Sequence, residues 1–155
     1  LFRLILKEEW PDDGRVKVEG TVALVPQEVK KDPVQKSCKT IRDYLCKAKK
    51  MGDDKLYEML SNLELNDLDL EDEPSQLSGG QKTKLALLFA LLKEPDILLL
   101  DEPTNFLDTA GKKWVMHFLS RYKKTLLIVS HDLDLLDRSI DKVVYVNKQT
   151  NEEKR

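Results

Sequence analysis

The hydrophobic pattern changes its period along this chain, and the change divides it into two parts. Residues 1–27 and 95–146 contain short apolar runs that predict strands, among them Thr21–Val25 and the uniformly apolar Ile97–Leu100. A strand that is apolar at every position is typical of the centre of a parallel sheet, where helices cover both faces. These two segments therefore predict the α/β core of one domain.

Weaker patterns predict the remaining elements of this core. We expect a helix over Leu1–Glu9 and a half-buried strand at Val16–Val18, where apolar and charged residues alternate. After the central strand we expect a helix, a strand, a helix and a final strand, at residues 109–122, 125–130, 133–140 and 143–146. Strands that alternate with helices indicate a mainly parallel sheet flanked by helices. Residues 147–155 are polar and predict a tail or the start of a linker.

Residues 28–94 have the pattern of a small helical subdomain. Their apolar residues recur at helical spacing, as at Ile41, Leu45, Ala48, Leu56, Met59, Leu60 and Leu63. The segment is rich in lysine, which favours a solvated helical face, with contact to phosphate as the alternative. We expect the acidic stretch Glu64–Glu73 to be exposed, and the mostly apolar Gln81–Leu92 to form a buried helix.

Charge and composition narrow the classes of partner. The 155 residues carry a net charge of −2, so no overall basic field favours nucleic acid or an acidic membrane. The longest apolar run, Leu85–Leu92, is far shorter than the roughly 20 residues that cross a bilayer. Cys38 and Cys46 have no zinc-ligand spacing, and we interpret them as reduced thiols of a cytoplasmic protein.

Polar residues that could bind a metal or take part in catalysis follow three of the predicted strands. Asp101 and Glu102 end the central apolar run, His131 follows the run that starts at residue 125, and Gln27 follows the early strand. The carboxyl ends of parallel strands form the edge at which α/β folds bind ligands. Two adjacent carboxylates there suit a Mg²⁺-nucleotide site, in which one holds the metal and the other deprotonates or orients a water molecule.

A second candidate site opens the helix after Leu77. Ser78, Gly79, Gly80 and Gln81 place two glycines and a hydroxyl at a helix N-terminus. Unpaired N–H groups and the positive end of the helix dipole make such a terminus attractive to anions. The alternative is an ordinary flexible helix cap.

Together, and in this order, these motifs resemble an ATP-binding cassette of the ABC type. The resemblance rests on Gln27, on Leu77–Gln81, on the segment Ile97–Asp108 and on Ser130–Asp132. It implies an ATPase with ATP and Mg²⁺ as ligands, a P-loop-like α/β fold, and a small helical subdomain that carries the signature helix.

The resemblance also implies a role for each residue at the strand ends. Asp101 would hold Mg²⁺, Glu102 would polarise the attacking water, and His131 would contact the γ-phosphate. Gln27 would lie near the metal and the water, and Asp108 would belong to the loop at the cassette interface.

In the family, the signature residues contact ATP that is held by the opposite cassette. The resemblance thus implies that Ser78, Gly79, Gly80 and Gln81 serve a second cassette, in the same chain or in a homodimer. A phosphate-binding loop of the form G-x-x-x-x-G-K-[ST] does not occur in this sequence. In the family this loop directly precedes a helix such as Leu1–Glu9. We therefore expect the sequence to start inside that helix and to bind ATP poorly on its own.

The segment Thr104–Asp108 resembles the soluble ABC-F group, whose members carry two cassettes and act on ribosomes during translation. That group usually reads Thr-Asn-His-Leu-Asp, and Phe106 replaces the histidine here. A ribosome or RNA partner is the implication. The alternatives are a motor subunit that drives a separate membrane transport subunit, and a degenerate cassette without hydrolysis. A chromosome or DNA-repair head is disfavoured, because the 49 residues between Gln27 and Leu77 leave no room for its coiled coil.

Overall fold

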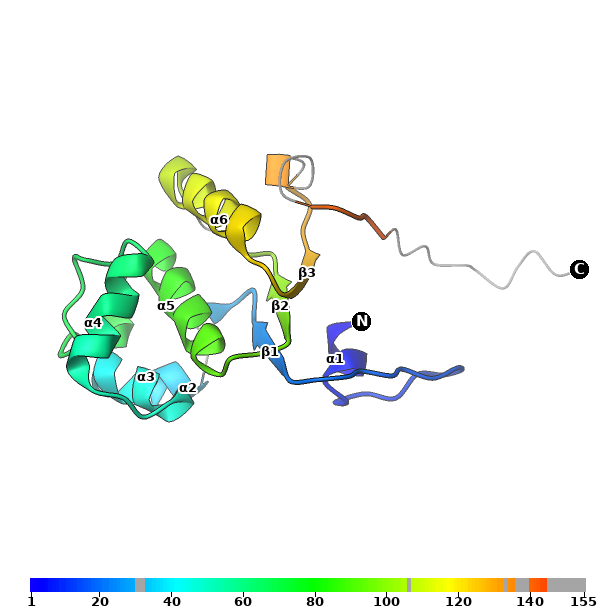
Figure 1. The fold of residues 1–155 in the computed structure, drawn as a ribbon, viewed down its shortest axis with the longest axis horizontal. Helices are drawn as coiled ribbons and strands as arrows, with labels where there is room; N and C mark the ends of the chain where they lie inside the picture. Colours follow the sequence, from blue (N-terminus) through cyan, green and yellow to red (C-terminus); the bar gives the residue numbers. More distant parts are fainter. Residues whose placement is uncertain (30–32, 106, 133, 136–139, 145–155) are drawn as a thin grey trace, which may run out of the picture.

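The computed structural model describes residues 1–29, 33–105, 107–132, 134–135 and 140–144. In chain order the elements are α1 (Phe2–Ile5), β1 (Val22–Val25), α2 (Pro33–Lys36), α3 (Ile41–Ala48), α4 (Asp53–Asn62), the 3-10 helix η2 (Pro74–Gln76), α5 (Gly79–Leu92), β2 (Ile97–Asp101), α6 (Thr109–Arg121) and β3 (Thr125–Val129). Figure 1 shows the strands at the centre, with α2 to α5 on one side of them and α1 on the other. The predicted α/β class, a parallel sheet flanked by helices, is confirmed.

The described strands form one parallel sheet in the order β1-β2-β3. The apolar run predicted as a central strand is β2, and its residues Leu98, Leu99 and Leu100 are at most 2% exposed. The register pairs Val25 with Leu100 and Asp101 with Val129. Because all pairs are parallel, the carboxyl ends of the strands meet at one edge, as the sequence predicts.

A polar contact fixes the opposite edge of the sheet, where β1 and β2 begin. The backbone N–H and the hydroxyl of Thr21 donate to Asp96 Oδ2 at 2.7 and 2.8 Å. These hydrogen bonds lower the pKa of Asp96 below its usual range. Gly20 has φ +95°, and a Cβ atom there would lie 2.7 Å from Asp96 Oδ2, so only glycine fits this approach.

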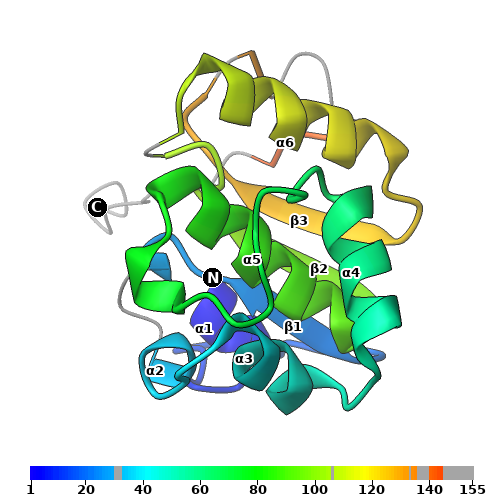
Figure 2. The ribbon, with the colours of Figure 1, turned by 90° about the vertical axis from the view of Figure 1, so that its left-hand side faces the viewer.

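The helical region packs around α5. Tyr44 of α3 stacks on Phe89 of α5 with ring centroids 4.4 Å apart, and Leu56 of α4 is completely buried. Figure 2 shows α3 below α5 and α4 to its right, and most of the apolar residues of α5 are buried. The apolar positions that predict helices thus form one core shared with the sheet.

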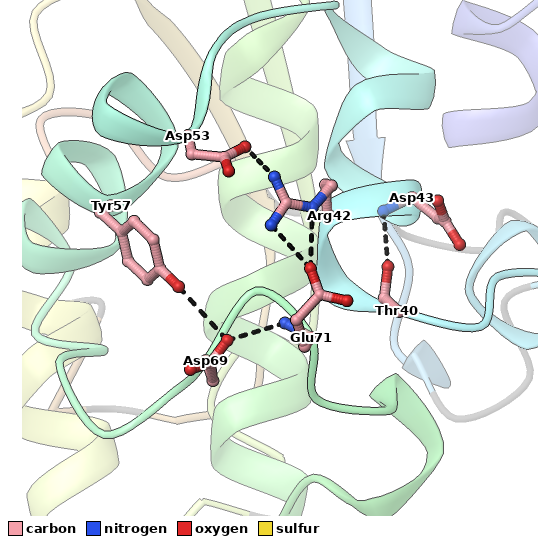
Figure 3. A network of polar contacts seen from close by, with 7 residues as sticks. All are labelled: Thr40, Arg42, Asp43, Asp53, Tyr57, Asp69 and Glu71. Atoms are coloured by element: carbon pink, nitrogen blue, oxygen red, sulfur yellow. Dashed lines mark hydrogen bonds and ion pairs between the residues drawn. The ribbon is translucent and has the colours of Figure 1, made fainter.

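A polar network ties the segment that precedes α5 to α3 and α4 (Figure 3). Arg42 donates to Glu71 Oε1 from Nε and Nη2, at 3.0 and 2.6 Å, and also pairs with Asp53. Asp69 Oδ1 accepts hydrogen bonds from the Tyr57 hydroxyl and from the backbone N–H of Glu71. The loop is therefore anchored by side chains from two helices.

Some expectations for this loop and for the chain ends are wrong. The stretch Glu64–Glu73 is not simply exposed, because its leucines alternate with its acids and turn inward: Leu65, Leu68 and Leu70 are 1%, 6% and 0% exposed. The first helix is shorter than Leu1–Glu9, because Lys7 adopts φ +60°, a left-handed conformation that ends a helix.

Two predicted strands are absent from the described residues. Residues 16–18 form no strand, and Val16 is 42% exposed, because no neighbouring described strand pairs with them. Val143 and Val144 also form no strand and are 70% and 79% exposed. Most of the predicted helix 133–140, the end of the predicted strand 143–146, Phe106 and the tail 147–155 lie outside the described residues. Within the described ranges, no helix is long and apolar enough to cross a membrane.

Candidate nucleotide site

The carboxyl edge of the sheet holds two adjacent carboxylates. β2 ends at Asp101, and Glu102 follows with φ +47°, a left-handed conformation that is rare for a residue with a side chain. The backbone N–H of Glu102 donates to the carbonyl of Val129 on β3 at 2.8 Å, which holds the turn in place. Backbone strain of this kind concentrates at functional sites, because the surrounding structure has to enforce it.

His131 lies directly against Glu102. Its Nδ1 is 2.9 Å from Glu102 Oε1, and its backbone N–H donates to Glu102 Oε2 at 3.4 Å. The side chain of Glu102 is 15% exposed, whereas that of His131 is 75% exposed. The sequence predicts these residues on one edge, and the structure joins them in direct contact, with the imidazole orienting a nearly buried carboxylate.

Asp101 is a half-buried carboxylate beside Glu102. Burial, with the nearby charge of Glu102, raises the pKa of Asp101 above its usual range. Within the described residues, no group of three or more histidine, cysteine or acidic side chains is placed to hold a metal by itself. Mg²⁺ is usually held by one or two carboxylates, water and substrate phosphates, so this donor set fits Mg²⁺ bound together with a nucleotide.

Gln27 lies at the same edge of the sheet. It follows β1 by two residues, two positions beyond the pair that Val25 makes with Leu100, and its side chain is exposed. The structure thus brings Gln27, Asp101, Glu102 and His131 to the ends of three neighbouring strands.

The remaining predicted residues form a second group at the start of α5. Ser78 Oγ accepts the backbone N–H of Gln81 at 3.2 Å, and Gln81 Oε1 accepts the backbone N–H of Ser78 at 2.9 Å. This reciprocal capping box explains why the helix starts at Gly79, two residues before its predicted start. Gln81 Nε2 donates to Asp67 Oδ2 at 2.7 Å, so the side chain of Gln81 is engaged at both ends.

Asp108 belongs to this second group. Its carboxylate caps α6 by accepting the backbone N–H of Gly111 at 2.7 Å. A cavity of about 430 Å³ lies between the starts of α5 and α6 and is lined by Ser78, Gly79, Gly80, Gln81, Lys84 and Asp108, among others. A Cβ atom on Gly80 would lie 3.6 Å from Leu107, which shows how closely the loop before α6 approaches α5.

Sequence reasoning missed three positioning residues. Asp67 holds Gln81, and Lys112 forms an ion pair of 3.0 Å with Asp132, next to His131. Thr104 is 3% exposed and lies near the same Asp132. The hydrogen bond from Lys112, with a smaller contribution from Thr104, lowers the pKa of Asp132. The sequence gives no periodic signal for such contacts, since their partners are 14 to 28 residues apart.

The sequence of this chain is similar to those of several known ATP-binding proteins, which carry different names. The chain is 41% identical over 97 residues to an uncharacterized ABC transporter ATP-binding protein, YfmM, of Bacillus subtilis, covering 63% of this chain and 19% of YfmM. It is 38% identical over 105 residues to the energy-coupling factor transporter ATP-binding protein EcfA2 of Staphylococcus epidermidis, covering 65% of this chain and 37% of EcfA2. The matched segments thus span well under half of either relative.

A solved structure and a family model agree with the fold. The archaeal ribosome recycling factor aABCE1, solved in complex with the ribosomal stalk protein aP1, superposes with a TM-score of 0.71 at 30% identity. The superposition covers 90% of this chain and 28% of that one. The family model described as "ABC transporter" matches residues 1–105, which include both Gln27 and the Asp101–Glu102 pair. On this match over more than half of its length, the chain belongs to the ABC transporter family of ATP-binding cassettes.

Proposed function

We propose that this chain is part of an ATPase that hydrolyses ATP between two cassettes and acts on the ribosome in the cytoplasm. The observation that carries the hydrolytic part is the contact of His131 with Glu102. It orients a nearly buried carboxylate at the ligand-binding edge of the sheet. Cassettes of this family in general bind ATP with Mg²⁺.

Each residue of the edge has a role in this proposal. Glu102 accepts a proton from the attacking water, and His131 holds the carboxylate in the orientation that this transfer needs. Asp101 is the residue that would hold Mg²⁺, with Gln27 beside it. Mg²⁺, when bound, supplies positive charge that neutralises the oxygens of the phosphates. Positioning and charge account for most of catalysis in phosphoryl transfer, which suits a site built from two carboxylates, an imidazole and an amide.

The second group of residues supports a paired arrangement. Ser78, Gly79 and Gly80 line an open cavity at the N-terminus of a 14-residue helix, where backbone N–H groups attract phosphate. Asp101 and Glu102 do not line this cavity. In our proposal the signature serves ATP held by a second cassette, in the same chain or in a second copy.

We also propose the division of the chain that this function needs. Residues 1–27 and 95–146 form the α/β core with the catalytic edge, and residues 28–94 form the helical subdomain with the signature. Residues 147–155 form a tail or the start of a linker.

The ribosomal part of the proposal rests on two likenesses. The segment Thr104–Asp108 resembles that of the ABC-F group. The superposed archaeal protein is a ribosome recycling factor that binds a ribosomal stalk protein. A second candidate function is that of a motor subunit for a membrane transporter, which the 38% identity with EcfA2 favours.

The test uses the full gene product that carries this chain, with the substitution Glu102→Gln. Loss of the carboxylate should block hydrolysis and leave ATP binding intact, so that the two cassettes stay closed on ATP. With ATP and cell lysate, we expect the variant to sediment with ribosomes in a sucrose gradient. The matched control is Glu58→Gln, which changes an exposed carboxylate on α4 and should behave as the unchanged protein.

Three other outcomes would overturn parts of the proposal. Recovery of the Glu102→Gln protein in the membrane fraction would favour the transporter motor. Equal sedimentation with and without ATP would remove the link between the nucleotide and the ribosome. An unchanged protein that binds ATP but does not hydrolyse it would identify a degenerate cassette.

A further inference from the structure

Charges in the helical region are separated along the sequence. Residues 33–50, which contain α2 and α3, hold six lysines and arginines and one acid, Asp43. Residues 51–73, which contain α4 and the loop after it, hold nine acids and one lysine. The net charge of −2 for the whole chain conceals this separation.

Two of these cations form ion pairs within the molecule, and all five lysines are exposed. Arg42 is directed at Glu71 and Asp53 (Figure 3), whereas the five lysines of the segment are all exposed: Lys36, Lys39, Lys47, Lys49 and Lys50. Lys49 pairs with Glu94. Lys36, Lys39 and Lys50 form no ion pair with any residue that the structure describes.

Three of the exposed lysines lie close together, and Lys50 follows the end of α3 by two residues. Lys47 Nζ, near the end of α3, donates to Ser37 Oγ, directly after α2, at 2.7 Å. This contact brings Lys47 beside the segment that carries Lys36 and Lys39. Figure 2 shows α2 and α3 next to each other below α5. Asp43 is the one acid that these residues add to the surface.

The side chains on this surface indicate which class of partner it would bind: a membrane, a protein or a nucleic acid. On α3 the apolar residues Ile41, Tyr44 and Leu45 are at most 1% exposed, and residues 33–50 expose no large apolar side chain. Binding to a membrane through an amphipathic helix needs an apolar face, and the centres of protein interfaces are apolar and poor in lysine. Lysines without an apolar neighbour instead suit the phosphate backbone of a nucleic acid.

We propose that Lys36, Lys39, Lys47 and Lys50 form a surface that binds the phosphate backbone of RNA. The inference rests on the proposed function, because the ribosome is where this chain would meet RNA. The inference adds to the proposed function the surface through which this chain would contact RNA. Recognition here is independent of base sequence, since an ammonium group is a point charge without the geometry that reads bases.

The test compares two triple variants of the full gene product that lose the same charge. Lys36→Gln, Lys39→Gln and Lys50→Gln remove the cations without an ion pair, and the control triple is Lys55→Gln, Lys113→Gln and Lys123→Gln, at exposed positions elsewhere. Binding to a labelled RNA hairpin of about 20 nucleotides is measured by fluorescence anisotropy over a series of salt concentrations. Circular dichroism and urea unfolding check that each variant is folded.

We expect the α2–α3 triple to bind the hairpin at least about tenfold more weakly at low salt. The slope of log K against log salt should become shallower by roughly 2, because each phosphate contact contributes about 0.7 to 0.9. The control triple should keep both the affinity and the slope. Equal weakening of both triples would overturn the proposal, as would an unchanged slope in a folded α2–α3 triple or binding to anionic lipid vesicles in place of RNA.

Two further measurements separate this proposal from the function on which it rests. ATP hydrolysis should be the same in both triples. If the Glu102→Gln protein sediments with ribosomes whether or not the α2–α3 lysines are present, the RNA surface is refuted and the proposed function stands. If the lysines are needed for hairpin binding but the protein never sediments with ribosomes, the RNA surface stands and the ribosomal function is refuted.

Discussion

The two groups of candidate residues are held by different kinds of interaction. At the sheet edge, Asp101 ends and Glu102 follows a strand that is buried on both faces and hydrogen-bonded on both sides. At the start of α5, Ser78 and Gln81 hold each other through side-chain hydrogen bonds, and Asp67 holds Gln81 from a loop. The first group depends on apolar burial and the second on exposed polar contacts. Substitutions should therefore affect the two groups to different degrees.

The largest effect that we predict is on catalysis at the sheet edge. His131→Ala removes the group that orients Glu102, and hydrolysis should fall by about 10²- to 10⁴-fold, the range for loss of acid–base chemistry. Stability should barely change, because the side chain of His131 is 75% exposed. Steady-state ATPase assays on the full gene product check this, with His117→Ala on α6 as the control. A loss of only a few-fold would mean that the contact with Glu102 is incidental.

The next effect tests the apolar support of that edge. Leu99→Ala should lower the free energy of unfolding by about 2–5 kcal/mol, because Leu99 is completely buried in β2 and a cavity would remain. Urea unfolding measures the change. Val144→Ala, at a position that is 79% exposed, should cost less than about 0.5 kcal/mol. A comparable loss from both substitutions would refute the central position of β2.

A third prediction concerns the left-handed backbone of Glu102. Glycine adopts φ +47° without a steric cost, whereas alanine does not. Both Glu102→Gly and Glu102→Ala should abolish hydrolysis. The glycine variant should be more stable by about 1 kcal/mol. Thermal unfolding of the pair decides the point, and equal stability would show that residue 102 carries no backbone strain.

At the start of α5 a smaller effect is expected. Ser78→Ala removes the capping oxygen and should cost about 1 kcal/mol of stability. Ser61→Ala, at an exposed position near the end of α4, is the matched control and should cost almost nothing. If Ser78→Ala destabilises the protein as much as Leu99→Ala does, the contrast between the two groups is wrong.

The smallest effect depends on pH. Hydrogen bonds from Thr21 lower the pKa of Asp96, so the ionised carboxylate stabilises the folded state. This contribution is complete above the unfolded pKa, about 3.9, and disappears as the pH falls through the folded value. Asp96→Asn should therefore be less stable than the unchanged protein at pH 7, and the difference should vanish in acid. Urea unfolding across this range measures it, and a constant difference would refute the role of the charge.

Those parts of the fold that depend on burial were predictable from the sequence. Ile97–Leu100 is apolar at every position and forms the central strand, and the polar residues after the strands meet at one edge. Val16–Val18 failed as a prediction because alternation identifies a strand only where another strand pairs with it.

Contacts between distant polar side chains were not predictable. Arg42 and Glu71 are 29 residues apart, and Asp67 reaches Gln81 across 14. No periodicity connects such partners, since the contact depends on how a loop is folded against two helices. The signature Ser78–Gln81 was recognisable in the sequence. The contacts by which Asp67 and Arg42 support the signature and the segment before it are evident only in the structure.

The separated charges of the helical region have a kinetic consequence. Residues 33–50 are basic and residues 51–73 are acidic, so the charge of the helical region is uneven although the net charge of the chain is only −2. In the field of a polyanion, such a molecule is turned so that its exposed lysines face the polyanion before contact. The rate of association should fall as salt is added, and most encounters at low salt should begin in the productive orientation.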